Sequence, residues 1–357
     1  MDISPQVPSD SIILRTEKVL VTGSNGFIGV KVVKTLLEYG YRDIRCFVRP
    51  SSRLANLKEV LNSFGLESQI EIVAGDLLSR DDCARAANGV SVIYHLAAGF
   101  DKSFAGAFMN SALTTRNLMD AFLQNGKVAR FVNVSSFAVY SNLKMKRGAM
   151  IDEASPLEDS PQERYDAYGF GKLKQEELVR EYGNEKALPY VILRPGTVFG
   201  PGKRDLTGRI GIDTFGFFIH LGGSNRLPLT YVDNCAEAIV LAGLRANVDG
   251  ETFNVVDDET LTSRQFLRAY KSRTKIFSVP LPYFAAYTLC ALWEKYSKWS
   301  KGQLAPAFNR RRCSAEWKGN RFSNAKIRAR LGWKPRVDLR NAMKEFLGQF
   351  AERTDQL

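Results

Sequence analysis

The chain has 357 residues, of which 45% are hydrophobic and 25% are charged, a composition typical of globular proteins that excludes extended disorder. The formal charge of +12 favours anionic partners, such as a phosphorylated cofactor, a nucleotide-linked substrate or an anionic membrane surface. Because no recognised nucleic-acid-binding motif accompanies this charge, we expect no nucleic-acid partner.

The five cysteines are scattered without the paired spacing of disulfides or of a metal site. With only two histidines and no cluster of them, the sequence gives no support for a metal mechanism. The first 18 residues lack the apolar stretch of a signal peptide. Together these features predict a cytoplasmic protein.

The first half of the chain alternates short apolar runs with helical patterns. Residues 1–16 are expected to form a flexible N-terminal arm. Strands are expected over 18–22, 44–48, 70–73, 92–96, 131–134 and 190–193, and helices from Gly29, over 107–123 and over 168–182. This alternation predicts a doubly wound parallel sheet, a Rossmann-like dinucleotide-binding domain over 17–195.

The alternation ends after Pro195, and glycines and prolines crowd residues 196–228. We expect 196–357 to form mainly a smaller C-terminal substrate-binding lobe. Residues 235–256, which include a helical pattern, are expected to pack back on the Rossmann domain.

A glycine-rich segment lies between the first strand and the first helix. Gly23, Gly26 and Gly29 are three residues apart, which permits a tight turn, close approach of a pyrophosphate and close helix–strand packing. In this strand–loop–helix context the segment predicts a dinucleotide site. The residues expected to contact the cofactor here are Gly23, Ser24, Asn25, Gly26, Phe27, Ile28 and Gly29.

The end of the second strand bears on the choice between NAD(H) and NADP(H). A carboxylate there would bind the ribose hydroxyls, but the sequence has Arg49, followed by Ser51, Ser52 and Arg53. Arg49 could hold a 2′-phosphate with help from Ser51, Ser52 or Arg53, so NADP(H) is favoured, while NAD(H) and a solvated basic loop remain alternatives. Asp76, after the third strand, could contact adenine or cap the next helix.

Tyr168 and Lys172 are four residues apart and share one face of the expected helix. The ordinary pKa of tyrosine, near 10, is too high for a base at neutral pH, and a neighbouring ammonium would lower it. Ser136 follows the fifth strand, at the edge of the sheet where ligands bind, and could hydrogen-bond a substrate oxygen. The alternative for each of these residues is an ordinary surface or turn position.

In several ordered motifs, from about residue 17 to 345, the chain resembles the extended short-chain dehydrogenases/reductases, also called the NAD-dependent epimerase/dehydratase family. TGSNGFIG at 22–29 resembles the cofactor loop of that family, and VSSFAVYS at 134–141 resembles its serine strand. YVDN at 231–234 resembles its substrate-lobe signature. The resemblance implies cofactor contacts from Asp76, Leu77, Leu96, Ala97, Ala98, Tyr168, Lys172, Pro195, Gly196, Thr197 and Val198.

The resemblance also implies catalytic roles. Tyr168 would be the general acid/base, Lys172 would lower its pKa and Ser136 would orient the substrate oxygen. Asn110 would take part in the proton relay. A homodimer is common in this family and is expected here.

Two further segments bear on the substrate. The leucine–proline form of Arg226-Leu227-Pro228-Leu229-Thr230 resembles the hydroxysteroid, sterol and flavonoid reductase branches, although Lys203, Arg204 and Arg209 could bind a diphosphate. The aromatic-rich segment 282–301 suits an interfacial helix, a hydrophobic substrate wall, or a helix packed in the lobe or at a dimer interface.

The function expected from the sequence is therefore an NAD(P)-dependent oxidoreductase that interconverts a carbonyl and an alcohol on a small-molecule substrate. One alternative is a nucleotide-sugar epimerase/dehydratase that oxidises and reduces its NAD within one cycle. A second is a non-catalytic cofactor-binding sensor, because a fold alone does not fix a function.

Overall fold

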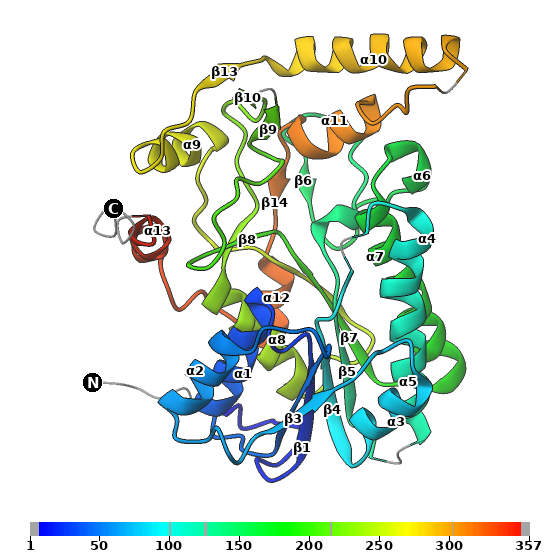
Figure 1. The fold of residues 1–357 in the computed structure, drawn as a ribbon, viewed down its shortest axis with the longest axis vertical. Helices are drawn as coiled ribbons and strands as arrows, with labels where there is room; N and C mark the ends of the chain where they lie inside the picture. Colours follow the sequence, from blue (N-terminus) through cyan, green and yellow to red (C-terminus); the bar gives the residue numbers. More distant parts are fainter. Residues whose placement is uncertain (1–6, 100, 125–126, 215, 302, 351–357) are drawn as a thin grey trace.

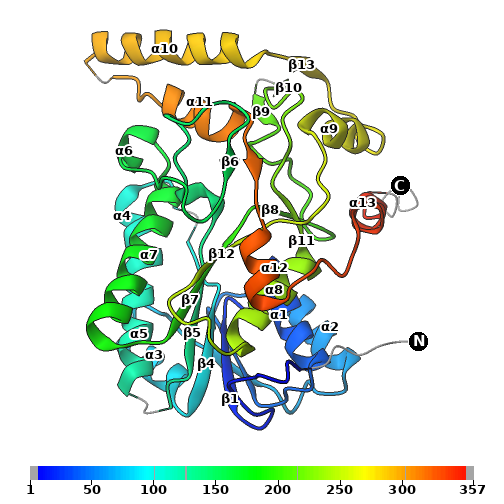
Figure 2. The ribbon, with the colours of Figure 1, turned by 180° about the vertical axis from the view of Figure 1, so that it is seen from behind.

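A seven-stranded parallel sheet forms the centre of the protein, seen in a computed structural model that describes residues 7–99, 101–124, 127–214, 216–301 and 303–350 (Figures 1 and 2). The strand order is β3-β2-β1-β4-β5-β7-β12, and every pairing is parallel. The strands are β1 (Lys18–Thr22), β2 (Ile44–Val48), β3 (Glu71–Ala74), β4 (Val90–His95), β5 (Arg130–Val134), β7 (Tyr190–Pro195) and β12 (Thr252–Val255). This confirms the predicted Rossmann-like α/β class.

Helices cover both faces of the sheet because both faces of its strands are apolar. In β1, Val19 and Val21 point into one core and Leu20 into the other. The first core is closed by α1 (Phe27–Glu38), α2 (Ala55–Ser63) and α8 (Val232–Leu244). The second is closed by α3 (Arg80–Ala87), α5 (Thr114–Gln124) and α7 (Ala167–Lys186). The burial of the strands, except for the edge strand β3, follows from this two-sided packing.

The helix expected over 107–123 differs from the prediction. It begins as α4 (Phe104–Ala107), widens into a π-helical segment, η1 (Phe108–Leu113), and continues as α5. Asn110 lies in the π-helical part. Such segments are rare and occur most often at functional sites.

The smaller lobe lies at the end of the sheet where the strands point, in the upper half of Figure 1. It contains the three-stranded sheet β9–β10–β13 and two strand pairs, β8–β11 and β6–β14. Its strands are β6 (Met150–Ile151), β8 (Thr197–Phe199), β9 (Gly211–Thr214), β10 (Phe217–His220), β11 (Leu229–Tyr231), β13 (Ser278–Pro280) and β14 (Arg321–Phe322). The remaining helices are η2 (Phe137–Val139), α6 (Pro161–Arg164), α9 (Ser263–Lys271), α10 (Tyr283–Trp299), α11 (Arg310–Trp317), α12 (Ala325–Leu331) and α13 (Leu339–Gly348).

Two segments beyond residue 195 return to the central sheet. β12 pairs with β7, and α8 packs on the sheet, where Tyr94 donates a hydrogen bond to the carbonyl of Val240 (3.3 Å). Residues 7–16 lie against the protein instead of forming the expected loose arm, because Ile13 is buried and the amide of Ile12 donates to the carbonyl of Leu244 (2.8 Å). Residues 1–6 of that expected arm lie outside the described residues.

Candidate active site

The glycine-rich segment forms a compact turn between β1 and α1. Gly23 has a φ of +67°, which favours glycine. A Cβ on Gly29 would lie 2.0 Å from the carbonyl oxygen of Gly23, so the turn can close only with glycine there. Gly26 caps α1 without a side-chain hydrogen bond, which leaves first-turn amide groups available to an anion. These features fit the pyrophosphate of a dinucleotide.

The loop after β2 lies beside this turn. The side chain of Asn25 donates a hydrogen bond to the backbone carbonyl of Arg53 (3.5 Å). Arg49 directly follows β2, and both arginine side chains are exposed. Neither forms an ion pair with any residue in the described part of the chain. The backbone at Arg53 therefore lies beside the turn where a dinucleotide fits, and both arginine side chains are free of carboxylate partners.

Asp76 does not cap α3. The N-cap is Ser79, whose hydroxyl accepts a hydrogen bond from the amide of Asp82 (3.2 Å). The carboxylate of Asp76 accepts from the amide of Leu78 (2.9 Å) and stays exposed. The capping interpretation of Asp76 is therefore wrong, and a contact with a ligand remains open to this side chain.

The other expected cofactor segments lie at the same edge of the sheet, after β4 and β7. The amides of Leu96 and Ala97 donate to the backbone and the side chain of Thr22 at the end of β1. Gly99 lies so close to η1 that a Cβ on it would be 2.5 Å from the Cβ of Asn110. The segment Pro195-Gly196-Thr197-Val198 joins β7 to β8. The structure thus brings Asn110 next to the segment that follows β4.

Ser136 and Tyr168 are hydrogen-bonded to each other. Ser136 begins η2 just after β5, and its hydroxyl accepts from the amide of Ala138 (3.2 Å). Tyr168 lies in the first turn of α7, which is capped by Asp166. Burial raises the pKa of Tyr168 to about 12, the bond to Ser136 acts in the opposite direction, and the charge of Asp166 adds to the increase.

The expectation that Lys172 lowers the pKa of Tyr168 is not met in this structure. Lys172 is buried, and its ammonium donates to the carbonyl of Val134 (2.7 Å) and to Oε1 of Gln175 (2.9 Å). Burial lowers the pKa of Lys172 itself to about 8, partly offset by the charge of Glu176. The ammonium is directed at these fixed acceptors, and burial dominates the ionisation of the phenol.

A chain of buried hydrogen bonds runs from Lys172 to the turn after β1. Nε2 of Gln175 donates to Oγ1 of Thr115 (2.8 Å), which lies 2.9 Å from Nε2 of His95. The other ring nitrogen of His95, Nδ1, lies 2.8 Å from Oγ1 of Thr22. The chain joins α7 and α5 to the ends of β4 and β1.

The protons along this chain can be assigned from the donors and acceptors alone. The single hydroxyl proton of Thr115 goes to the carbonyl of Ser111 (2.6 Å), which can only accept. Thr115 therefore accepts from both Gln175 and Nε2–H of His95, and Nδ1 of His95 accepts the hydroxyl of Thr22. Burial, with a smaller contribution from the charge of Lys172, lowers the pKa of His95 to about 3, which keeps this ring neutral.

A buried ion pair also joins α7 to β7. Glu176 accepts two hydrogen bonds from Arg194 on β7, at 2.9 and 2.7 Å, and both side chains are almost fully buried. Burial alone would raise the pKa of Glu176, but the bonds and charge of Arg194 outweigh it and hold this pKa below its usual value. Arg194 also donates to the hydroxyl of Tyr140 (2.9 Å). The pair fixes α7 against the sheet.

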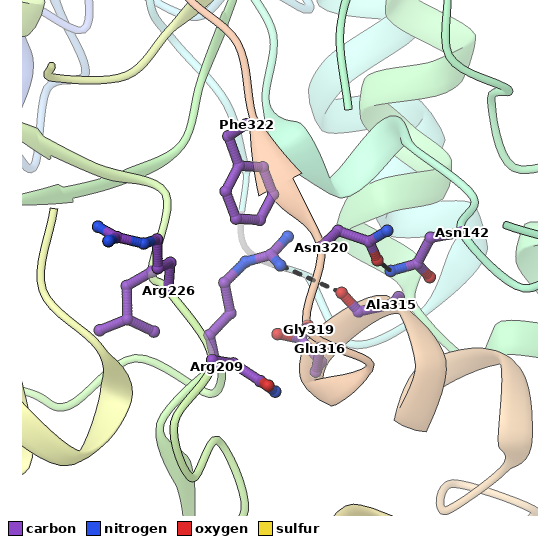
Figure 3. Close-up of a pocket in the computed structure, with 10 residues that line it drawn as sticks. Asn142, Arg209, Arg226, Ala315, Glu316, Gly319, Asn320 and Phe322 are labelled. Atoms are coloured by element: carbon purple, nitrogen blue, oxygen red, sulfur yellow. Dashed lines mark hydrogen bonds between the residues drawn. The ribbon is translucent and has the colours of Figure 1, made fainter. Parts of the chain in front are cut away.

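A polar pocket lies beyond Ser136 in the smaller lobe (Figure 3). Its wall includes Phe322, whose ring is 5.6 Å from that of Phe137, the residue after Ser136. Arg209 extends into the pocket and donates to the carbonyl of Ala315 (3.1 Å). The pocket is lined by Asn142, Arg209, Asn225, Arg226, Leu227, Ala315, Glu316, Gly319, Asn320 and Phe322.

Two side chains of this pocket are without full partners in the described part of the protein. Asn142 donates to Oδ1 of Asn320 (2.8 Å), but its own Oδ1 is buried and accepts no hydrogen bond. Arg209 has no carboxylate within ion-pair distance, and burial lowers its pKa. Of the three basic residues expected to bind a diphosphate, Lys203 and Arg204 lie elsewhere, near Phe27 and Phe350. The pocket is small, about 10 Å³, and its walls therefore hold one buried acceptor without a partner and one guanidinium without a carboxylate.

Comparison with known proteins identifies the family. A model of the NAD dependent epimerase/dehydratase family matches residues 19–255. The chain belongs to this family. It is thus an enzyme of the extended short-chain dehydrogenase/reductase type, as the motifs predicted.

The relatives of this chain include proteins named as dehydrogenases and proteins named as nucleotide-sugar epimerases, the two enzyme activities expected from the sequence. The chain is 27% identical to a 3 beta-hydroxysteroid dehydrogenase/Delta 5→4-isomerase of Mycobacterium tuberculosis, over 97% of this chain and 94% of the relative. It is 30% identical to YtcB of Bacillus subtilis, described as an uncharacterized UDP-glucose epimerase, over 67% and 76% of the two chains. In fold it is similar to UDP-glucuronic acid 4-epimerase of Bacillus cereus, solved with NAD, with a TM-score of 0.69, 22% identity and coverage of 94% and 99%.

We expect the Glu176–Arg194 pair to be required for stability. Glu176→Leu would leave the guanidinium buried without its carboxylate, which typically costs about 3–5 kcal/mol of unfolding free energy. Glu176→Leu/Arg194→Met removes both charges and should recover most of that loss. Urea unfolding followed by circular dichroism measures both. A double variant as unstable as the single one would contradict this account of the pair.

Proposed function

We propose that this family member interconverts a carbonyl and an alcohol on a small-molecule substrate, with Tyr168 as general acid/base. The hydrogen bond between Ser136 and Tyr168, at the edge of the sheet where the glycine-rich turn also lies, is the observation that carries the proposal. A bound nicotinamide would supply or accept the hydride. The described side chains then position the substrate oxygen and move its proton.

In the direction of reduction, the substrate oxygen lies against the hydroxyls of Ser136 and Tyr168. A pKa near 12 keeps Tyr168 protonated at neutral pH, so that it can donate its proton as the carbonyl carbon receives the hydride. The O–H bond of Tyr168 breaks, the alcohol O–H forms, and a phenolate remains. Ser136, whose hydrogen bond lowers the pKa of Tyr168, stabilises that phenolate, while Lys172 holds α7 against the end of β5. Oxidation follows the same steps in reverse.

Asn110 is proposed to take part in returning the proton to Tyr168. Its place in η1, next to Gly99 and therefore to the segment after β4, supports this role. The π-helical turn displaces the helix at this residue. We propose that the turn sets the position of Asn110 relative to the cofactor segments.

The second candidate function, a nucleotide-sugar epimerase or dehydratase, is supported by the relative YtcB and by the polar lining of the small pocket in Figure 3. The guanidinium of Arg209, which has no carboxylate partner among the described residues, suits a phosphate or carboxylate. Segment 282–301, which could have formed a hydrophobic substrate wall, contributes no residue to this pocket. A hydroxysteroid substrate keeps the support of the relatives over nearly the whole chain.

The proposed cofactor preference is for NADP(H). The exposed guanidinium of Arg49 at the end of β2, together with Arg53 beside Asn25, offers two cations to a 2′-phosphate. The family and the NAD-containing neighbours support a nicotinamide cofactor in general. A homodimer and a cytoplasmic location stay predictions from the sequence.

Tyr168→Phe should strongly reduce turnover without loss of cofactor binding. We expect kcat to fall by about 10²–10⁴-fold because the proton donor is removed. The assay uses a panel of 3β-hydroxysteroids and UDP-hexoses: a net change in nicotinamide absorbance indicates a reductase, and a new sugar without such a change indicates an epimerase.

The matched control is Tyr165→Phe, which alters an exposed tyrosine three residues earlier and should retain turnover. Full activity of Tyr168→Phe on any substrate turned over by the unaltered protein would refute the assignment. Equal losses in both variants would point to a structural effect instead.

Arg49→Ala should weaken NADPH binding specifically. Loss of one charged hydrogen bond corresponds to roughly a 10- to 100-fold weaker Kd for NADPH, while the Kd for NADH should stay unchanged. Titration of each cofactor by fluorescence measures both, with Arg80→Ala, at an exposed arginine of α3, as control. Tighter binding of NADH than NADPH by the unaltered protein would contradict the proposed preference.

A further inference from the structure

One side of α10 is both exposed and apolar. Leu289, Leu292, Tyr296 and Trp299 recur at helical spacing along it, and their exposed fractions are 54%, 56%, 46% and 77%. Figures 1 and 2 show α10 lying across the end of the smaller lobe, at the greatest distance from the central sheet. These side chains thus form an apolar stripe at one extremity of the molecule.

The opposite side of α10 holds the helix firmly in place. Ala286 and Cys290 are buried in a cluster with Cys313 and Trp317 of α11. Glu294 forms an ion pair with Arg310 (2.8 Å), and the indole of Trp293 donates to the carbonyl of Ala305 (3.1 Å). The apolar stripe is therefore the outer face of a helix whose other side is packed against the protein.

Exposed apolar side chains also occur on the neighbouring segment. Phe277, just before β13, is 72% exposed, and Val279 within β13 is 41% exposed. Phe284, in the first turn of α10, is 73% exposed. Since large apolar side chains are normally exposed singly, such a grouping marks an interaction surface.

The charges of the segment that carries this surface are mostly positive. Residues 271–301 contain six basic side chains, at Lys271, Arg273, Lys275, Lys295, Lys298 and Lys301, and a single acid, Glu294. Glu294 is already paired with Arg310, and none of the six basic side chains has an ion-pair partner within the described chain. The segment therefore combines exposed apolar and aromatic side chains with basic side chains that have no carboxylate partner among the described residues.

We infer that this surface of α10 and β13 docks on an anionic lipid bilayer. Tyr and Trp side chains favour the boundary between headgroups and acyl chains, and flanking lysines reach lipid phosphates. Each Lys or Arg near an anionic leaflet adds attraction. A second copy of the chain is a poorer occupant, because two-fold packing of this face would bring its unpaired lysines against each other.

The test is flotation of the full-length protein with vesicles of phosphatidylcholine alone or with one third phosphatidylserine. We expect binding only to the anionic vesicles. Lys295→Glu/Lys298→Glu should weaken it by about tenfold or more. The matched charge reversal Lys58→Glu/Lys127→Glu, at exposed lysines of the Rossmann domain, should have a much smaller effect.

The apolar stripe is tested by Leu292→Ser against Leu14→Ser, a leucine that is 70% exposed elsewhere. We expect only Leu292→Ser to weaken vesicle binding. Absence of binding to anionic vesicles, or equal losses in both members of either matched pair, would overturn the inference. It would also be overturned if Leu292→Ser changed the mass in solution, measured by light scattering, and left vesicle binding intact, because the face would then join two copies.

Discussion

The buried ammonium of Lys172 is the constraint on which the rest of the site depends. A cation removed from water must be held by fixed acceptors, because an uncompensated buried charge is very costly. Here the acceptors are the carbonyl of Val134 at the end of β5 and the side chain of Gln175 one turn along α7. Meeting this requirement fixes the distance between the sheet edge and the helix that carries Tyr168.

The hydrogen bonds that hold Lys172 continue through neutral side chains to the glycine-rich turn. Gln175 is oriented by Thr115, Thr115 by His95, and His95 by Thr22, the residue that precedes Gly23. Because each of these groups has a determined proton position, none can be replaced by a residue with a different donor pattern without leaving a buried polar atom unpaired. The glycine-rich turn and the acid–base pair are therefore parts of one hydrogen-bonded unit.

Much of this arrangement could be predicted from the sequence, and the reasons are local. The turn at 22–29 requires glycines that are visible as letters, and the apolar runs identify the strands. Tyr168 and Lys172 share a helix, so their common face follows from their spacing alone. The π-helical turn around Asn110 left no such signal, because one extra residue in a helical turn hardly changes an apolar pattern.

The side chains that connect Lys172 to the glycine-rich turn were not predicted from the sequence, for a different reason. Gln175 lies three residues after Lys172, a spacing that could have suggested a contact, but Thr115 and Thr22 are polar residues of common type, far away in the sequence. The predicted direction of the shift in the pKa of Tyr168 was also wrong. Burial, which cannot be read from the sequence, raises this pKa, and the ammonium of Lys172 is hydrogen-bonded to other groups. Contacts between distant segments are what the sequence alone could not supply.

The most direct test of this account is the ionisation of Lys172 itself, followed by the Cε resonances of ¹³C-labelled lysine and assigned with Lys172→Arg. Burial predicts that one resonance titrates near pH 8 and is absent from the variant. Gln175→Leu removes an acceptor of the ammonium and should shift that titration to lower pH, against Gln162→Leu, an exposed glutamine of α6, as control. Titration of Lys172 near 10, like an exposed lysine, would contradict the central role given to this buried cation.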